Sequence, residues 1–404
     1  MFLRHQRACR SVSGQGGVKD LSCSWLTSLH PARTPLQSEY EWQKVPPQRT
    51  IRQFGEAPGV SIQNMSATPS PLDCFIQFFT VQVINFIVEM TNLNAQKKLQ
   101  VTSAHRATRQ LPPLKFEPST FEQMKAFLGL TIAMGIVKLP VIAMYWQEKH
   151  WIFEVPSFSK IMPRDRYHDL LKFLHFCNED YAPSRDNPAR DKLCKIRPPL
   201  NLLETRMLTV YTPRREISID EFLISFKGQI GFRQFILSKR ARFGMKVWVL
   251  AESKTGYISC IQLYTGKSAG AAPEAGQATR VVKDLITSFE YQNYHLYVNN
   301  FYSSPDLFAS LLGQGVYACG TIRPNLKAFP KDLIIKSIAK IQRGFTDWRV
   351  SGKLLAQSWV DNKAIYFLST IHGPEYPESY KGSKSVKRRG GRCTASAGVD
   401  VTCP

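Results

Sequence analysis

Apolar residues in the first half of the chain recur at the period of an α-helix. From Ser70-Pro71, where proline suits a first helical turn, apolar positions share a face as far as residue 90. A second helical pattern follows Ser119, with Glu122 three residues on as in a capping box, and a third covers residues 164–176. We therefore predict a helical region over residues 67–214.

Beyond residue 214 the pattern alternates between strand and helix periods. The predicted elements are, in chain order, a strand at 216–220, a hairpin of 245–252 and 257–264, a helix at 278–288, a strand at 294–298, a helix at 304–312 and a strand at 317–321. This is the order of an α/β domain of the RNase H-like type, which has a mixed central sheet. We predict that domain over residues 215–380, with an insertion at about 325–355.

The two ends of the chain show neither period. Residues 1–66 are rich in Ser, Gly, Pro, Gln and Arg, which predicts a disordered tail. Residues 381–404 contain the run KGSKSVKRRGGR, and no acid lies between Glu378 and Asp400. This composition predicts a basic flexible tail suited to nuclear import or to contact with phosphates.

The formal net charge of +22 points to a polyanionic partner. Nucleic acid is the partner we favour over an anionic membrane or a merely solvated basic surface. No apolar run approaches the length of about 18 residues that a membrane span needs, so no membrane association is expected. The nine cysteines are scattered, without the spacing of a zinc site.

Asp220 is the first candidate for metal-ion chemistry. Cutting a phosphodiester with two divalent ions needs several carboxylates that hold the ions roughly 3.5–4 Å apart, and Mg²⁺ takes oxygen ligands. In RNase H-like nucleases these acids lie on the first strand, at the end of a neighbouring strand and on a later helix. Asp220 ends the first predicted strand and is followed by Glu221. A turn cap is the structural alternative for such an isolated aspartate.

A series of short motifs, ordered along residues 65–404, resembles the piggyBac transposase family, and among its members the vertebrate transposable element-derived proteins. The motifs include Leu72-Asp73-Cys74-Phe75, Phe127-Leu128-Gly129-Leu130, Leu174-His175-Phe176, Ser218-Ile219-Asp220-Glu221, Phe226-Lys227-Gly228, Arg242-Phe243-Gly244-Met245-Lys246, Asn299-Asn300-Phe301-Tyr302 and Gly320-Thr321-Ile322-Arg323. The resemblance implies an RNase H-like transposase catalytic core preceded by an α-helical dimerisation and DNA-binding region. It also implies cut-and-paste transposition at TTAA sites by three aspartates with Mg²⁺.

The resemblance carries over to this chain only in part. The first aspartate maps to Asp220, whereas the second falls in an Asp-Asn-Phe motif that reads Asn299-Asn300-Phe301 here. The third lies in a Met-Gly-Gly-Val-Asp motif after a Cys-Pro pair, and the nearest match ends at Asp400, before Cys403-Pro404. We expect this third ligand and the family's C-terminal zinc module to be missing.

An asparagine at position 299 offers a neutral oxygen where a carboxylate should offset a divalent charge. Loss of such a ligand predicts a rate at least about a thousandfold lower. We therefore predict a degenerate site in which Asp220 is the remaining metal ligand, Mg²⁺ is not bound productively and DNA is not cut. Two alternatives stay open: an active endonuclease that uses Asp220, Glu221 and unrecognised acids, and an interaction protein that does not bind DNA.

DNA binding is a separate prediction, because phosphate contacts need positive charge and no metal. The candidate DNA-binding residues flank the predicted site, with Phe235 and Phe243 between them: Lys227, Lys239, Arg240, Arg242 and Lys246. We predict a nuclear, transposase-derived DNA-binding protein, and leave open whether it is a homodimer.

Overall fold

The computed structural model describes residues 40–46, 50–62, 68–112, 114–147, 158–184, 187, 190–237, 239, 241–266, 274, 276–338 and 341–374. The predicted basic tail at 381–404 lies outside these ranges, and so do Arg240 and Asp400.

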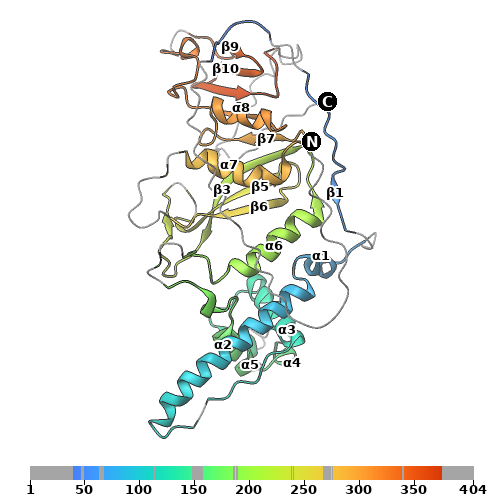
Figure 1. Ribbon diagram of the computed structural model, residues 1–404, viewed down its shortest axis with the longest axis vertical. Helices are drawn as coiled ribbons and strands as arrows, with labels where there is room; N and C mark the ends of the chain where they lie inside the picture. Colours follow the sequence, from blue (N-terminus) through green and yellow to red (C-terminus); the bar gives the residue numbers. More distant parts are fainter. Residues whose placement is uncertain are drawn as a thin grey trace, which may run out of the picture. The chain divides into compact units, whose positions relative to one another are not determined.

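The described chain is helical between residues 71 and 210 (Figure 1). Its helices are α1 (Pro71–Phe78), α2 (Val81–Ala107), α3 (Phe121–Ile136), α4 (Phe158–Ile161), α5 (Arg164–Phe173) and α6 (Arg197–Val210), with short 3-10 turns η1 (Ile142–Trp146) and η2 (Glu179–Tyr181). The predicted capping box at Ser119 and Glu122 is displaced by one residue. Thr120 caps α3 instead, and Gln123 returns the bond to the Thr120 backbone.

The first predicted helical face is divided between α1 and α2. Thr80 caps the start of α2 through the Val83 backbone N–H, and the two helices are bent by 60°. No single helix of the described residues is long and apolar enough to cross a membrane; only α1 and α2 taken together meet that test, by length and composition alone. Helices α2, α3 and α5 share one apolar core, to which α2 gives Val83, Ile84 and Ile87, α3 gives Met124, Phe127 and Leu130, and α5 gives Tyr167 and Leu170.

Residues 211–369 form most of the strands (Figure 1). They are β2 (Tyr211–Thr212), β3 (Glu216–Ser225), β4 (Gln234–Phe235), β5 (Phe243–Glu252), β6 (Ile258–Leu263), β7 (His295–Val298), β8 (Tyr317–Thr321), β9 (Thr346–Ser351), β10 (Leu354–Val360) and β11 (Ala364–Ser369). The main sheet has the order β4-β5-β3-β7-β8-β11-β10-β9, and β6 also pairs with β5. Strands β3, β7 and β8 run parallel, whereas β5 and β6 form an antiparallel hairpin beside β3.

Two amphipathic helices connect the parallel strands. Helix α7 (Gln277–Ile286) leads from β6 to β7 and buries Val281, Val282, Leu285 and Ile286, and α8 (Pro305–Gly313) leads from β7 to β8 and buries Leu307, Phe308 and Leu311. Short 3-10 turns, η3 (Thr287–Phe289) and η4 (Lys331–Leu333), follow α7 and β8. This connectivity confirms the predicted mixed sheet of the RNase H-like type. Because strands buried on both faces need apolar neighbours, the two helices supply the cover that parallel pairing requires.

The sheet is wider than the predicted core. Strands β9, β10 and β11 extend it beyond β8, and β11 pairs antiparallel with β8. The predicted insertion at about 325–355 therefore includes strand β9, which belongs to the sheet itself. Buried and half-buried positions alternate along part of β10. This strand lies beyond residue 321, where the last predicted strand ends.

Part of the predicted N-terminal tail at 1–66 is ordered against the sheet. Gln43 pairs antiparallel with Val350 at the β9 edge, and the Trp42 indole donates to the Ala328 carbonyl. Strand β1 (Gly59–Val60) pairs with β2, and the Phe54 ring lies edge-on to Tyr294 at 4.8 Å. Here the structure differs from the predicted disorder, because a polar segment can be held by main-chain pairing that leaves no apolar period.

Candidate functional site

Asp220 and Asn299 are brought together by the parallel pairing of β3 and β7. Ile219 pairs with Val298, so the next residue on each strand reaches the same end of the pair. There the Asn299 side-chain Nδ2 donates to the Asp220 carboxylate Oδ1 at 3.1 Å. Asp220 and Asn299, which are 79 residues apart in the sequence, are thus direct neighbours.

The Asn299 amide is fixed in one orientation. Its Oδ1 accepts from the Phe301 backbone N–H at 2.8 Å, as in an Asx turn. The Ser303 hydroxyl donates to the Asn299 carbonyl at 3.1 Å and closes the same loop. Since the amide oxygen is engaged by the backbone, the group that Asn299 presents to Asp220 is its NH₂, which is a hydrogen-bond donor.

Close main-chain packing on both sides of β3 and β7 holds this arrangement. A Cβ at Gly244 on β5 would lie 2.0 Å from the Ile224 carbonyl oxygen on β3. A Cβ at Gly320 on β8 would lie 2.3 Å from the Val298 carbonyl oxygen and 2.6 Å from the Ser303 hydroxyl. Glycine at these positions therefore allows β5 to approach β3 closely and β8 to approach β7 closely.

Glu221, the second acid of the predicted site, has partners of its own. The Tyr302 hydroxyl donates to its Oε2 at 3.0 Å, and the Lys239 ammonium lies 3.6 Å from its Oε1. The Lys239 Nζ also donates to the Glu221 carbonyl at 2.9 Å. These contacts show a role for Tyr302 that the sequence reasoning missed, although its place just after the second-ligand motif was a signal.

The charges in this cluster influence one another. Burial raises the pKa of the Asp220 carboxyl above its ordinary value, and the Glu221 charge adds to the rise, whereas the Glu221 backbone N–H and Lys239 oppose it. Burial lowers the pKa of the Lys246 ammonium, against the attraction of Glu221. Burial, with help from Glu221, also raises the pKa of Tyr302, so its hydroxyl stays a hydrogen-bond donor at neutral pH.

The donors gathered here do not fit a two-cation centre. Where Asp220 and Asn299 face each other, Asp220 offers a carboxylate, whereas Asn299 offers an NH₂ group that would repel a cation. Within the described ranges, no three His, Cys, Asp or Glu side chains are grouped so that they could hold a metal ion. The ammonium groups of Lys239 and Lys246 interact electrostatically with the Asp220 carboxylate. We derive no catalytic step through Mg²⁺.

A family model described as Transposase IS4 matches residues 70–395. The chain belongs to this transposase family, in its piggyBac group. It is 29% identical over 310 residues to PiggyBac transposable element-derived protein 3 of Homo sapiens, which covers 75% of the chain and 48% of that relative. It is 26% identical over 363 residues to PiggyBac transposable element-derived protein 2 of Homo sapiens, covering 86% of the chain and 57% of the relative.

A solved piggyBac transposase, in a synaptic complex with hairpin DNA, has the same fold. It superposes with a TM-score of 0.66 at 22% sequence identity, over 80% of this chain and 66% of that chain. Together these findings confirm the predicted piggyBac resemblance and the predicted fold class. The piggyBac-family chain spans about half the length of the curated relatives it matches.

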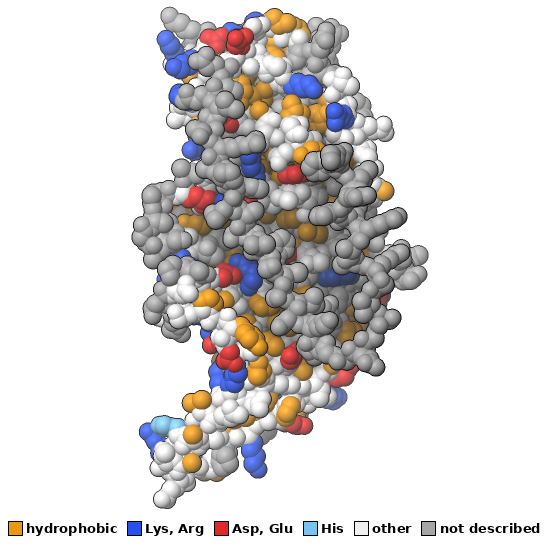
Figure 2. Space-filling view, in the orientation of Figure 1, with side chains coloured by type: hydrophobic (Ala, Val, Ile, Leu, Met, Phe, Trp, Pro, Cys, Tyr) orange, Lys and Arg blue, Asp and Glu red, His pale blue; other side chains and the backbone are white. Residues whose placement is uncertain are grey.

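The basic residues predicted to contact DNA occupy different settings in the piggyBac-family chain. Lys239 pairs with Glu221, and the Lys246 Nζ lies over the rings of Trp248 at 5.1 Å and Phe301 at 5.2 Å. Lys227 and Arg242 are exposed. On the face shown in Figure 2, described lysine and arginine side chains are spread among acidic ones and form no single stripe. The structure thus brings Lys239 and Lys246 to the candidate site, and leaves Lys227 and Arg242 open to solvent.

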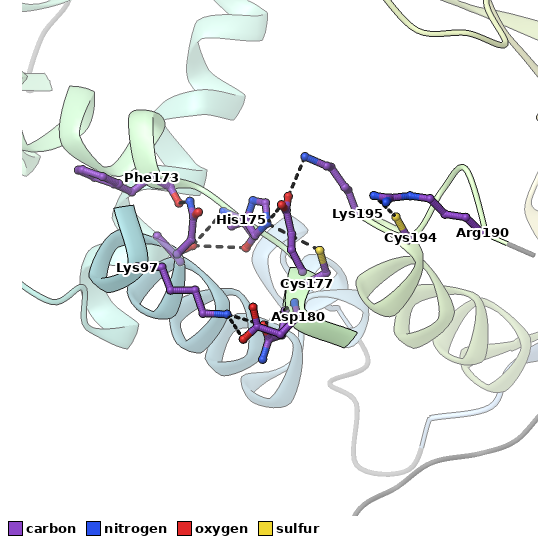
Figure 3. A network of polar contacts seen from close by, with 12 residues as sticks. Lys97, Phe173, His175, Cys177, Asp180, Arg190, Cys194 and Lys195 are labelled. Carbon is purple, nitrogen blue, oxygen red and sulfur yellow. Dashed lines mark hydrogen bonds and ion pairs between the residues drawn. The ribbon is translucent and has the colours of Figure 1, made fainter. Parts of the chain in front are cut away.

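A second polar cluster lies in the helical part (Figure 3), and several of its residues line a pocket of about 340 Å³ against α2. Glu179 accepts from Lys195 at 2.7 Å and lies 3.3 Å from the His175 Nε2, and the Asn94 side chain donates to the Phe173 carbonyl at 2.8 Å. Burial lowers the pKa of His175. The Asn94 bond ties α2 to the end of α5, and Glu179 links His175 to Lys195.

Proposed function

We propose that this piggyBac-family chain binds DNA in the nucleus and does not cut it. The hydrogen bond from Asn299 to Asp220 is the observation that carries the proposal. In a two-cation nuclease both positions would be carboxylates, and a cation between them would offset their charges. Here an amide NH₂ satisfies Asp220 directly, so the residues hold their positions without a cation.

The chemical consequence is a loss of transition-state stabilisation. Of the two facing positions only Asp220 carries a negative charge, and an amide in place of the second carboxylate lowers the attraction for a divalent cation by several kcal/mol, or about a thousandfold or more in rate. Mg²⁺ is the ion that the resemblance to the family implies. We propose that this site does not bind it productively. The rest of the proposal follows the domain plan, with residues 67–214 serving dimerisation and DNA binding and residues 215–380 forming the former catalytic domain.

Positive charge supports the DNA-binding half of the proposal. The net charge of +22 exceeds what a folded chain needs for solubility, and Lys227 and Arg242 are exposed to solvent. The solved piggyBac transposase of the same fold is itself bound to DNA. The run KRRGGR within residues 387–392 supports nuclear import.

Fluorescence anisotropy with labelled duplex DNA tests this function. Each phosphate contact that is lost should lower the slope of log affinity against log salt by about 0.9. We expect Lys227→Ala and Arg242→Ala each to lower the slope by about this amount for any duplex sequence. Lys353→Ala, an exposed lysine in the turn between β9 and β10, is the matched control and should leave the slope unchanged. Binding that is absent, or that does not respond to salt, would favour a protein-interaction role instead.

A further inference from the structure

Two phenylalanines stand exposed at one edge of the main sheet. Phe235 on β4 pairs with Phe243 on β5, and their ring centroids are 4.8 Å apart at an interplanar angle of 42°. The side chains are 57% and 50% exposed. An exposed pair of this kind is costly in water and marks a surface where a flat or apolar group binds.

The exposed apolar surface continues along β3 toward the candidate site. Phe222 is 39% and Ile224 is 40% exposed, and they pair with Val247 and Met245 on β5. Directly opposed residues of antiparallel strands share a face, and every second residue along a strand does too. Asp220, Phe222, Ile224 and Phe243 therefore lie on one face, which runs from the candidate site to the aromatic pair.

A cation lies beside one of these rings. The Arg233 guanidinium is centred 5.6 Å from the Phe243 ring, and its Nη1 donates to the Lys227 and Gly228 carbonyls at 3.0 and 3.1 Å. These bonds keep a positive charge at the edge of the aromatic pair. Exposed Arg242 is the immediate neighbour of Phe243. An uncharged apolar partner would gain nothing from this charge, whereas a polyanion with flat rings would use both features.

Unpaired DNA bases fit this combination. In a duplex the base faces are stacked inside and unavailable, but a single strand offers each base to an aromatic side chain and each phosphate to a cation. We propose that Phe235 and Phe243, with Arg233 beside them, form a stacking platform for unpaired bases of DNA. This inference rests on the proposed DNA binding and names the form of DNA: a single strand or an unpaired end that follows the sheet face toward Asp220.

The test compares a labelled oligothymidylate of about 20 nucleotides with a duplex of equal length, by anisotropy at matched salt. Stacking is worth about 1–3 kcal/mol per base, so Phe235→Ala combined with Phe243→Ala should weaken single-strand binding about tenfold or more. Duplex affinity should change by less than about twofold, and the salt slope should not change, because no cation is removed. Phe243→Trp should keep or strengthen single-strand binding.

Phe345→Ala is the control, because Phe345 is a similarly exposed phenylalanine, at 45%, in the segment before β9. Circular dichroism and a melting curve establish that each variant is folded. Equal losses on single strand and duplex, or no loss on either, would overturn the platform while leaving DNA binding intact. A double variant that turns a dimer into a monomer would also overturn it, because the patch would then be a contact between copies. Failure of the unaltered protein to bind any DNA would instead defeat the proposed function.

Discussion

Asn299 differs from aspartate by one group, an NH₂ in place of an oxygen, and the structure shows what that group does. It donates to Asp220 while the amide oxygen stays with the Phe301 backbone. An aspartate in the same rotamer would keep the Phe301 bond and turn a second carboxylate oxygen toward Asp220 at about the same separation as the present hydrogen bond. Two carboxylates so close cannot both be ionised unless a cation lies between them. Without a cation, they hold one proton between them.

Asn299→Asp should therefore destabilise the protein in the presence of a chelator by about 1–3 kcal/mol at neutral pH. Burial already raises the pKa of Asp220, and a second carboxylate raises it further. A carboxyl whose folded-state pKa is raised costs nothing below its unfolded pKa, so the deficit should appear as the pH rises above about 4 and reach its full size above the folded-state pKa. Denaturant unfolding at a series of pH values measures it.

Asn300→Asp is the matched control for that experiment, because it adds the same charge at the exposed neighbouring residue. It should stay within about 0.5 kcal/mol of the unaltered protein at each pH. Millimolar Mg²⁺ should stabilise Asn299→Asp selectively. Equal pH profiles for the two variants would mean that Asn299 does not control the charge balance at Asp220.

At the level of secondary-structure elements, the pairing of β3 with β5 fixes the strand that carries Asp220. Nine residue pairs, from Ile217 with Glu252 to Ser225 with Gly244, connect them. Glu252 is buried at the start of this ladder and accepts from the Tyr211 hydroxyl at 2.7 Å and from the Arg214 backbone N–H at 3.1 Å. The segment between α6 and β3 is thereby fixed to the sheet before Asp220 is reached.

Gly244→Ala should separate these strands. Its Cβ would lie 2.0 Å from the Ile224 carbonyl oxygen, and because that atom is backbone the strands themselves must move. We expect a loss of about 3 kcal/mol or more in the free energy of unfolding, measured by denaturant titration. Gly129→Ala, in the interior of α3 with nothing within 4 Å, should gain about 0.5–1 kcal/mol. A Gly244→Ala protein as stable as the unaltered chain would show that β3 and β5 are not held so tightly.

Strong periodicity made most elements predictable, and its absence explains the errors. The strand at 317–321 has the predicted bounds, and the predicted helix at 304–312 is observed as Pro305–Gly313. The capping box was assigned one residue early because Ser119 and Thr120 are both capping residues, and Ser119 is instead bonded to Asn92. The pairing of Gln43 with Val350 was invisible in the sequence, because main-chain bonds to a distant strand edge require no apolar pattern.

On the scale of the whole molecule, the net charge of +22 and the family both favour DNA binding. The candidate site differs from a nuclease site, because an amide stands where a second carboxylate is expected. The sequence singled out Asp220 and Asn299, and the parallel strands bring them together. Sequence alone could not show that the Asn299 NH₂ faces Asp220, that Tyr302 and Lys239 engage Glu221, or that Phe235 and Phe243 stay exposed. These features depend on loop geometry and on contacts between residues far apart in the chain.

The most direct test of the account is an assay of DNA cleavage. Purified protein is incubated with end-labelled duplex and hairpin DNA in Mg²⁺ or Mn²⁺, and products are compared with those of Asp220→Ala. Because Asn299 removes one charged ligand, we expect no more product than the Asp220→Ala background, at salt concentrations where the DNA is bound. Metal-dependent cleavage that disappears in Asp220→Ala would contradict the account, since it would mean that the amide at position 299 does not silence the site.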